Sequence, residues 1–266
     1  MEHIDSPANK KVKLAIALKQ RKQRDKNGLF VAEGLRLCEM AAAGDWQISY
    51  GLLTRQLTSQ ERGRALTAQL ELNGCPLYEV PENVFAKASG TETPQGILLV
   101  MASKNLPLPE RAEGDAPLYV VMDGVQDPGN AGTIIRTADA VGASGVILLK
   151  GSVDVFSDKV VRSTMGSLFH VPLYAGVAPE ELLKFSETSG LQLVATALDE
   201  TATPHFERDF RLGTAIVLGN EGHGVSETVL SGAQKTYIPM YGQAESLNVG
   251  MSAAIVLYEA LRQRQF

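Results

Sequence analysis

The chain has 266 residues, of which 44% are hydrophobic and 21% charged, and its formal net charge is −5 at pH 7. This length suggests two domains that each bury a core. No apolar run reaches the about 20 residues of a membrane span, and the residues after Met1 are too polar for a signal peptide. Two cysteines and four histidines without metal-ligand spacing argue against a disulfide framework and a metal site. We therefore expect a cytoplasmic protein without a structural metal.

The charge is unevenly placed along the chain. Residues 10–36 hold nine Lys and Arg against two acidic residues, whereas residues 118–266 hold ten against sixteen. A basic segment in an acidic protein favours a polyanion that is bound at one place. A solvated helix face explains the same residues, so the charge alone leaves nucleic-acid binding open. The side chains expected to contact RNA phosphates in this segment are Lys11, Lys19, Arg21, Lys22 and Arg24.

Helices and strands alternate in the first part of the chain. Residues 9–24 have apolar side chains four apart with basic residues between them, which predicts a helix. The elements expected after it are strands over 29–32, 48–53, 77–80 and 96–101 and helices over 34–43, 59–72 and 82–88. Residues 103–117 hold three prolines and little periodicity. We therefore predict a small α/β domain over 1–102, a linker over 103–117 and a second domain over 118–266.

The second part repeats the alternation. Strands are expected over 118–122, 145–149, 171–174, 191–197, 214–218 and 236–240, and helices over 130–141, 158–167, 179–188, 225–232 and 247–264. Several of these strands are apolar without alternation, as Leu118-Tyr-Val-Val-Met122 is. Such strands are covered on both faces, so the sheet should be mostly parallel. The fold class is therefore α/β in both domains.

Three loops each follow a predicted strand with small, turn-forming residues. They are Asp123-Gly-Val-Gln-Asp-Pro-Gly-Asn-Ala-Gly-Thr-Ile-Ile-Arg136, Leu218-Gly-Asn-Glu-Gly-His-Gly224 and Ile238-Pro-Met-Tyr-Gly-Gln-Ala-Glu-Ser-Leu-Asn-Val249. Ligands of open α/β sheets bind at the carboxyl ends of the strands, so three such loops describe one crevice. Each loop leaves polar side chains at its edge: Asn130 and Arg136, Glu221, and Ser246 and Asn248.

Helix capping is the structural alternative for several of these polar residues. Asn130, Glu221 and Ser246 each stand near the start of a predicted helix, where such side chains are common. Asn248 lies within the first turn, where asparagine is less favourable, so a contact made by its amide is more plausible. A P-loop motif and a dinucleotide-binding glycine fingerprint are both missing.

Together the three loops resemble the three signature motifs of the SpoU-type RNA ribose 2′-O-methyltransferases of the SPOUT superfamily. The resemblance covers residues 118–266 in the order of the family's motifs. The segments Phe30-Val-Ala-Glu-Gly34 and Pro94-Gln-Gly-Ile97 are similar to the RNA substrate-binding domain that these enzymes often carry, which has a ribosomal-protein-like fold.

The resemblance implies a trefoil knot, an exception to the rule of un-knotted chains, and a homodimer through the second domain. For that dimer we expect the last helix to contribute part of the interface through an apolar face of Val249, Ala253, Val256, Leu257 and Ala260. A single domain could also bury this face internally, and helix spacing alone does not decide between the two. It also implies S-adenosylmethionine as cofactor. The residues expected to bind it are Leu218, Gly219, Asn220, Gly222, Ile238, Met240, Leu247 and Asn248.

The expected activity is methylation of a ribose 2′-hydroxyl in structured RNA, and ribosomal RNA is the expected substrate. The family assigns base-like work to Arg136, but a guanidinium stays protonated in proteins. We therefore expect Arg136 to grip an RNA phosphate and to stabilise the developing oxyanion, with Asn130, Glu221, Ser246 and Asn248 holding the reactants. The alternatives are a non-catalytic RNA-binding or ribosome-assembly factor, a transfer-RNA 2′-O-methyltransferase, and an enzyme that methylates a base nitrogen.

Overall fold

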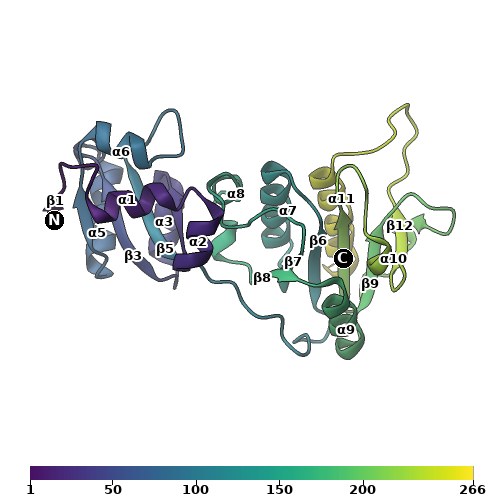
Figure 1. The fold of residues 1–266 in the computed structure, drawn as a ribbon. Helices are drawn as coiled ribbons and strands as arrows, with labels where there is room; N and C mark the ends of the chain where they lie inside the picture. The colour runs from purple at the N-terminus through teal and green to yellow at the C-terminus, as the bar shows by residue number, and fades with distance from the viewer. Residues whose placement is uncertain (266) are drawn as a thin grey trace. The chain divides into compact units, whose positions relative to one another are not determined.

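The computed structural model describes residues 1–265, which divide into two compact units (Figure 1). The first unit contains Met1–Lys104 together with Asp154–Phe169, and the second contains Asn105–Val153 and the chain from His170 onward. The sequence places the division at 103–117 and leaves 154–169 in the second domain. The structure differs because the side chains of this segment pack into the core of the first unit.

The first unit is built on a five-stranded sheet in the order β1-β4-β3-β5-β2. β5 is antiparallel to both of its neighbours, and the remaining pairs are parallel. The strands are β1 (Glu2–His3), β2 (Leu29–Glu33), β3 (Ile48–Leu53), β4 (Leu77–Glu79) and β5 (Ile97–Ala102). The helices are α1 (Lys10–Ala17), α2 (Arg21–Asn27), α3 (Leu35–Ala43), α4 (Arg55–Ser59), α5 (Glu61–Leu72), α6 (Glu82–Ala88), α8 (Asp158–Ser163) and the 3-10 turn η1 (Ser167–Phe169).

The helix expected over 9–24 is two helices in the structure, α1 and α2. Val12, Ala15 and Leu18 are buried on one side of α1, and Arg24 of α2 is buried as well. At 100° per residue, an unbroken helix would turn Arg24 about 180° away from that apolar side. The extended backbone of Gln20 interrupts the helix, so both sets of side chains face inward.

The second unit has a seven-stranded, all-parallel sheet in the order β10-β12-β9-β11-β6-β7-β8. Its strands are β6 (Leu118–Asp123), β7 (Gly145–Leu149), β8 (Leu173–Val177), β9 (Gln192–Thr196), β10 (Thr203–Pro204), β11 (Thr214–Gly219) and β12 (Gln234–Tyr237). Its helices are α7 (Pro128–Ala140), α9 (Pro179–Ser189), the 3-10 turn η2 (His205–Glu207), α10 (Glu227–Leu230) and α11 (Val249–Gln265). The predicted parallel sheet is confirmed.

Helices cover both faces of this sheet. Tyr119 and Val121 of β6 pack in one cluster with Phe185 of α9 and Val229 of α10. Because successive side chains of a strand point to opposite faces, Val120 lies on the other face, where α7 and α11 pack. All six residues of β6 are buried, which explains its apolar sequence without alternation.

The last helix, α11, uses its apolar side within the second unit. Ala253, Val256, Leu257 and Ala260 are buried there, against α7 and β11. The expectation that they form a dimer surface is therefore wrong, because intramolecular packing already covers them. A different side of α11 leaves Met251, Ile255 and Tyr258 exposed. Among residues 1–265, no helix is long and apolar enough to cross a membrane.

Candidate active site

A pocket of about 440 Å³ lies at the carboxyl ends of β9, β11 and β12, where the strands of a parallel sheet give way to loops. Two of the three motif loops line it directly, those over 219–224 and 238–249. Its lining residues are Thr196, Ala197, Leu198, Gly219, Asn220, Glu221, Gly222, Gly224, Thr236, Tyr237, Ile238, Met240, Ser246, Leu247, Asn248, Val249 and Ser252.

Backbone forms much of one wall of this pocket, because the loop after β11 folds back on itself. The amide N–H of Asn220 donates to the carbonyl of Gly224, and that of Gly224 to the carbonyl of Asn220, both at 2.9 Å. A Cβ on Gly219 would lie 2.2 Å from the carbonyl carbon of Gly224, so a larger residue is excluded there. Gly224 itself has φ +72°, which glycine adopts without strain.

A chain of hydrogen bonds joins all three motif loops beside the pocket. The Nδ2 of Asn130 donates to Oε1 of Glu221 at 2.9 Å, and Oδ1 of Asn130 accepts from Nδ2 of Asn248 at 2.9 Å. The amide of Asn130 is therefore held from both sides. The backbone N–H groups of Gln126 and Asp127 also donate to the Glu221 carboxylate, each at 3.3 Å.

These donors determine the protonation of Glu221. Partial burial disfavours its charged form, but the bonds from Asn130, Gln126 and Asp127 outweigh burial and lower the pKa of this carboxyl below its usual value. Glu221 is therefore ionised at neutral pH. A carboxylate that is occupied by three N–H donors is better suited to fixing the loops than to taking a proton from a substrate.

Asn248 also caps the start of α11. Its Oδ1 accepts from the backbone N–H of Gly250 at 2.9 Å and of Met251 at 3.2 Å, so the residue caps the helix while its Nδ2 reaches Asn130. The capping alternative and the contact expected for its amide are thus both present. The N-cap of α7 is Asp127 rather than Asn130, which leaves the Asn130 side chain free for the network.

Arg136 lies on α7 and does not line the pocket. Its side chain is exposed. The other arginines of the second unit, Arg111, Arg208, Arg211, Arg262 and Arg264, each donate to a carboxylate, an amide or a backbone carbonyl. Arg136 is the exception among the described residues of that unit, so its guanidinium is available to an external anion.

Most residues expected to bind a cofactor line the pocket, namely Gly219, Asn220, Gly222, Ile238, Met240, Leu247 and Asn248, and Ser246 lies among them. Leu218 does not, because it is fully buried inside β11. Sequence reasoning missed Thr196, Ala197 and Leu198, which close another wall. Their position at the end of the predicted strand 191–197 was the available signal, since ligands gather where parallel strands end.

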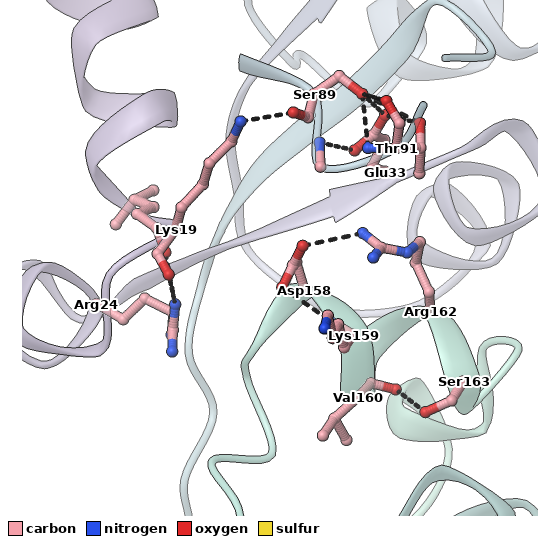
Figure 2. A network of polar contacts seen from close by, with 12 residues as sticks. Lys19, Arg24, Glu33, Ser89, Thr91, Asp158, Lys159, Val160, Arg162 and Ser163 are labelled. Carbon is pink, nitrogen blue, oxygen red and sulfur yellow. Dashed lines mark hydrogen bonds and ion pairs between the residues drawn. The ribbon is translucent and has the colours of Figure 1, made fainter. Parts of the chain in front are cut away.

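Two of the basic residues expected to bind RNA are engaged inside the first unit (Figure 2). Arg24 is 7% exposed and donates to Asp154 Oδ2 and to the carbonyls of Leu18 and Lys19. Arg24 is therefore removed from the predicted RNA contacts, because its guanidinium already has internal acceptors. Lys19 donates to the carbonyls of Lys87 and Ser89.

The other three basic residues differ in their solvent exposure and in their contacts. The ammonium of Lys11 lies 4.5 Å from the centre of the Tyr78 ring, a cation–π contact that leaves the residue half-buried. Arg21 and Lys22 are exposed, and Arg21 makes a long ion-pair contact of 3.8 Å with Asp25. Of the five basic residues predicted to contact RNA, the two on α2 that are exposed, Arg21 and Lys22, are therefore the most accessible.

A profile of the SpoU rRNA Methylase family matches residues 117–258, a stretch that contains all three motif loops. The chain belongs to this family. Residues 9–99 match the MRM3-like substrate binding domain. Both matches agree with the resemblance that the motifs carry. Among residues 1–265, no group of three or more His, Cys, Asp or Glu side chains is arranged to hold a metal ion.

Relatives match over nearly the whole chain. The 23S rRNA (guanosine(2553)-2′-O)-methyltransferase of Bacillus subtilis is 38% identical over 97% of this chain and 98% of its own. The 23S rRNA (uridine(2479)-2′-O)-methyltransferase of Streptomyces viridochromogenes is 32% identical, over 93% and 87%. The structure of an AdoMet-bound rRNA methyltransferase from Sinorhizobium meliloti superposes with a TM-score of 0.88 at 33% identity, covering 98% of this chain and 97% of that one.

Proposed function

We propose that this protein methylates a ribose 2′-hydroxyl of ribosomal RNA and uses S-adenosylmethionine as methyl donor. The observation that carries the proposal is the Glu221–Asn130–Asn248 chain, which joins the three family motifs beside a backbone-lined pocket. The relatives named as 23S rRNA 2′-O-methyltransferases support both the reaction and the RNA.

The pocket fits the cofactor. Its walls combine backbone polar groups around Gly219 and Gly224 with the apolar side chains of Ile238, Met240 and Leu247, a mixture that suits an adenosine and a methionine chain. When bound, S-adenosylmethionine supplies an electrophilic methyl group. The residues proposed to hold it are Gly219, Asn220, Gly222, Ile238, Met240, Leu247 and Asn248, together with Thr196 to Leu198.

Residues of the protein must stabilise the negative charge that develops on the ribose oxygen. A 2′-hydroxyl becomes a better nucleophile as its proton leaves, and a fixed positive charge stabilises the oxyanion that develops. Arg136 is exposed and has no hydrogen-bond or ion-pair partner among residues 1–265, so we assign its guanidinium to an RNA phosphate and to that oxyanion. The proton leaves the ribose oxygen as the methyl group transfers, and the phosphate that Arg136 holds relays it to water. Asn130, fixed by Glu221 and Asn248, orients the nucleotide, and Ser246 contributes a hydroxyl at the edge of the pocket.

The RNA is recognised mainly by the first unit. Exposed basic side chains lie on α1 and α2, whereas residues 118–266 carry ten basic against sixteen acidic residues and repel a polyanion overall. We assign phosphate contacts to Arg21 and Lys22 and add the exposed Lys10, Lys13 and Lys26. A separate recognition domain favours ribosomal over transfer RNA, and a ribosomal substrate favours a cytoplasmic location.

We further propose a homodimer through the second unit. The exposed side chains Met251, Ile255 and Tyr258 recur every three to four residues along α11, so they form one apolar stripe. Such a stripe on a helix end that borders the motif loops suits a contact with a second copy. The trefoil knot of the family is part of the same proposal.

Arg136→Ala tests the function. We expect methyl transfer to in vitro transcribed 23S rRNA to be lost, while titration calorimetry finds S-adenosylmethionine affinity unchanged, because Arg136 does not line the pocket. Arg211→Ala is the matched control, since it removes an exposed arginine of the same unit that is paired with Asp209. Appreciable turnover by Arg136→Ala refutes the role of Arg136. RNA binding by the parent protein without cofactor binding indicates a non-catalytic RNA-binding factor. Methylation of transfer RNA alone indicates a transfer-RNA 2′-O-methyltransferase.

A further inference from the structure

Residues 154–169 leave the second unit and complete the core of the first. The ring of Phe156 lies 5.1 Å from that of Phe30, and the ring of Phe169 lies 5.4 Å from that of Trp46. The indole N–H of Trp46 donates to the carbonyl of Phe169 at 3.2 Å. Since these contacts are buried, the first unit lacks part of its core without this segment. We refer to residues 154–169 as the inserted segment.

The chain enters the inserted segment through two neighbouring residues that are anchored in different units. Asp154 accepts from Nη2 of Arg24 at 2.6 Å, and Arg24 belongs to the basic helix α2. Val153, one residue earlier, donates its backbone N–H to the carbonyl of Val125 at 2.9 Å. Val125 lies in the motif loop that leads into α7. One peptide bond therefore separates the anchor on the RNA-binding helix from the anchor on the motif loop.

The chain leaves the inserted segment in the same way. Phe169 is held by Trp46 of the first unit. His170, the next residue, places its Nδ1 3.2 Å from Oδ2 of Asp139, which lies in the last turn of α7. Both anchors in the second unit are thus on the flanks of one helix: Val125 just before α7 begins and Asp139 near its end. α7 carries Asn130 and Arg136.

We infer that the inserted segment couples RNA held by the first unit to the position of α7, so that Arg24, Asp154, Asp139 and His170 act as positioning residues for Arg136. An RNA that changes the mobility of α2 changes the freedom of the buried Arg24–Asp154 pair. Because Val153 and His170 adjoin the inserted segment, RNA binding then changes the mobility of both ends of α7. Coupling of this kind requires a measured energetic link between the two sites, and intermediacy in space is not sufficient. The inference rests on the proposed function for the identity of the ligand, RNA.

Two variants break the anchors without removing any group assigned to catalysis. The double variant Arg24→Gln/Asp154→Asn leaves no unpaired buried charge, which a single change would create. His170→Ala releases the other end and alters a half-exposed side chain. The controls break more exposed ion pairs elsewhere: Arg62→Gln/Glu39→Gln in the first unit and Arg211→Ala in the second.

The decisive measurement is the single-turnover rate of methyl transfer at saturating in vitro transcribed 23S rRNA and S-adenosylmethionine. We expect each anchor variant to lose about 10-fold in this rate, a typical size for coupling between sites, with dissociation constants for RNA and cofactor unchanged. The controls keep the parent rate. A folded anchor variant with the parent rate overturns the inference, and so does a loss that appears only in RNA affinity.

Hydrogen exchange gives a second readout that does not depend on turnover. RNA should raise the protection of residues 123–140 in the parent protein and in the controls, but not in the anchor variants. If the parent binds RNA without any change in this stretch, the coupling is refuted. If the parent binds RNA and protects α7 yet transfers no methyl group, the proposed function fails and the coupling stands.

Discussion

The Glu221→Gln variant probes the charge in the hydrogen-bond chain without changing its shape. In the parent protein Oε1 accepts from Asn130 at 2.9 Å and from the backbone N–H of Asp127 at 3.3 Å, while Oε2 accepts from that of Gln126 at 3.3 Å. The amide of Gln offers only one acceptor oxygen, so a backbone N–H would face an NH2 group. The remaining bonds also lose their charge assistance.

The effect on stability should be small and the effect on rate larger. A hydrogen bond to a charged group contributes roughly 1.5–3 kcal/mol and a neutral one roughly 0.5–1.5 kcal/mol. Because the Glu221 side chain is largely exposed, solvent screening reduces that difference. We expect a loss of about 1 kcal/mol in the free energy of unfolding. Misplacement of Asn130 should slow methyl transfer by roughly 10- to 100-fold, since orientation contributes strongly to such a step.

The pH dependence has a definite sign. Burial opposes ionisation of Glu221, but its hydrogen bonds prevail and the pKa of its carboxyl is lower in the folded protein than in the unfolded chain. Such a group stabilises the fold above its unfolded pKa, and this stability is lost as the pH falls through the folded pKa. The stability difference between parent and Glu221→Gln should therefore be full at pH 7 and should shrink below the unfolded pKa, about pH 4.3.

Urea unfolding across this pH range and single-turnover methyl transfer at pH 7 are the two measurements. Glu227→Gln is the control, because Glu227 is also exposed in the second unit and belongs to no hydrogen-bond chain among residues 1–265. A stability difference that stays constant from pH 7 to acid would refute the role of the ionised carboxylate. A rate equal to the parent's would show that Asn130 needs no fixed partner.

Three further predictions follow from single features of the structure. Gly219→Ala should destabilise the second unit by about 1–3 kcal/mol and weaken cofactor binding, because the added Cβ would lie 2.2 Å from the Gly224 backbone. Gly242→Ala, whose Cβ would meet open space, should do neither. Urea unfolding and titration calorimetry measure the two effects. Tyr258→Asp should shift sedimentation from dimer to monomer, whereas Leu72→Asp, which changes a still more exposed apolar residue of the first unit, should not. A parent monomer at micromolar concentration contradicts the dimer. Replacing Arg21, Lys22 and Lys26 by Gln should lower the salt slope of RNA binding by about 0.7–0.9 units per lost contact, measured by filter binding, and an unaltered slope contradicts their assignment.

The sequence predicts the parallel sheet and its loops well because local pattern decides them. β6 and β11 are continuous apolar runs since helices cover both of their faces, and the turn-forming residues mark where they end. The inserted segment could not be predicted in this way. Its helix and apolar residues look the same in sequence whether they pack on one unit or the other, and only Phe30 and Trp46, more than a hundred residues away, determine which.

Site residues are likewise predictable where local geometry constrains them and unpredictable where long-range packing does. The sequence predicts that Gly219, Glu221 and Asn248 lie together, because turn geometry and an unfavourable helix position limit what their residue types can do, and all three line the same pocket. Basic residues carry no such limit. Arg24 and Lys22 have the same character in sequence, but one is buried against Asp154 and the other is exposed. Which of them is free depends on the break between α1 and α2, which the spacing of apolar residues does not predict.

The way in which Glu221 is held also explains how an acidic unit can keep a free arginine for RNA. Carboxylates in folded proteins often pair with a lysine or an arginine, and Arg136 lies on α7, the helix that carries Asn130. Here the partners of Glu221 are instead neutral N–H groups, from Asn130 and from the backbone of Gln126 and Asp127. They satisfy the carboxylate without consuming a positive charge. Among residues 1–265 the guanidinium of Arg136 therefore has no ion-pair partner, so it can bind a phosphate of a polyanion that the net negative charge of residues 118–266 otherwise repels.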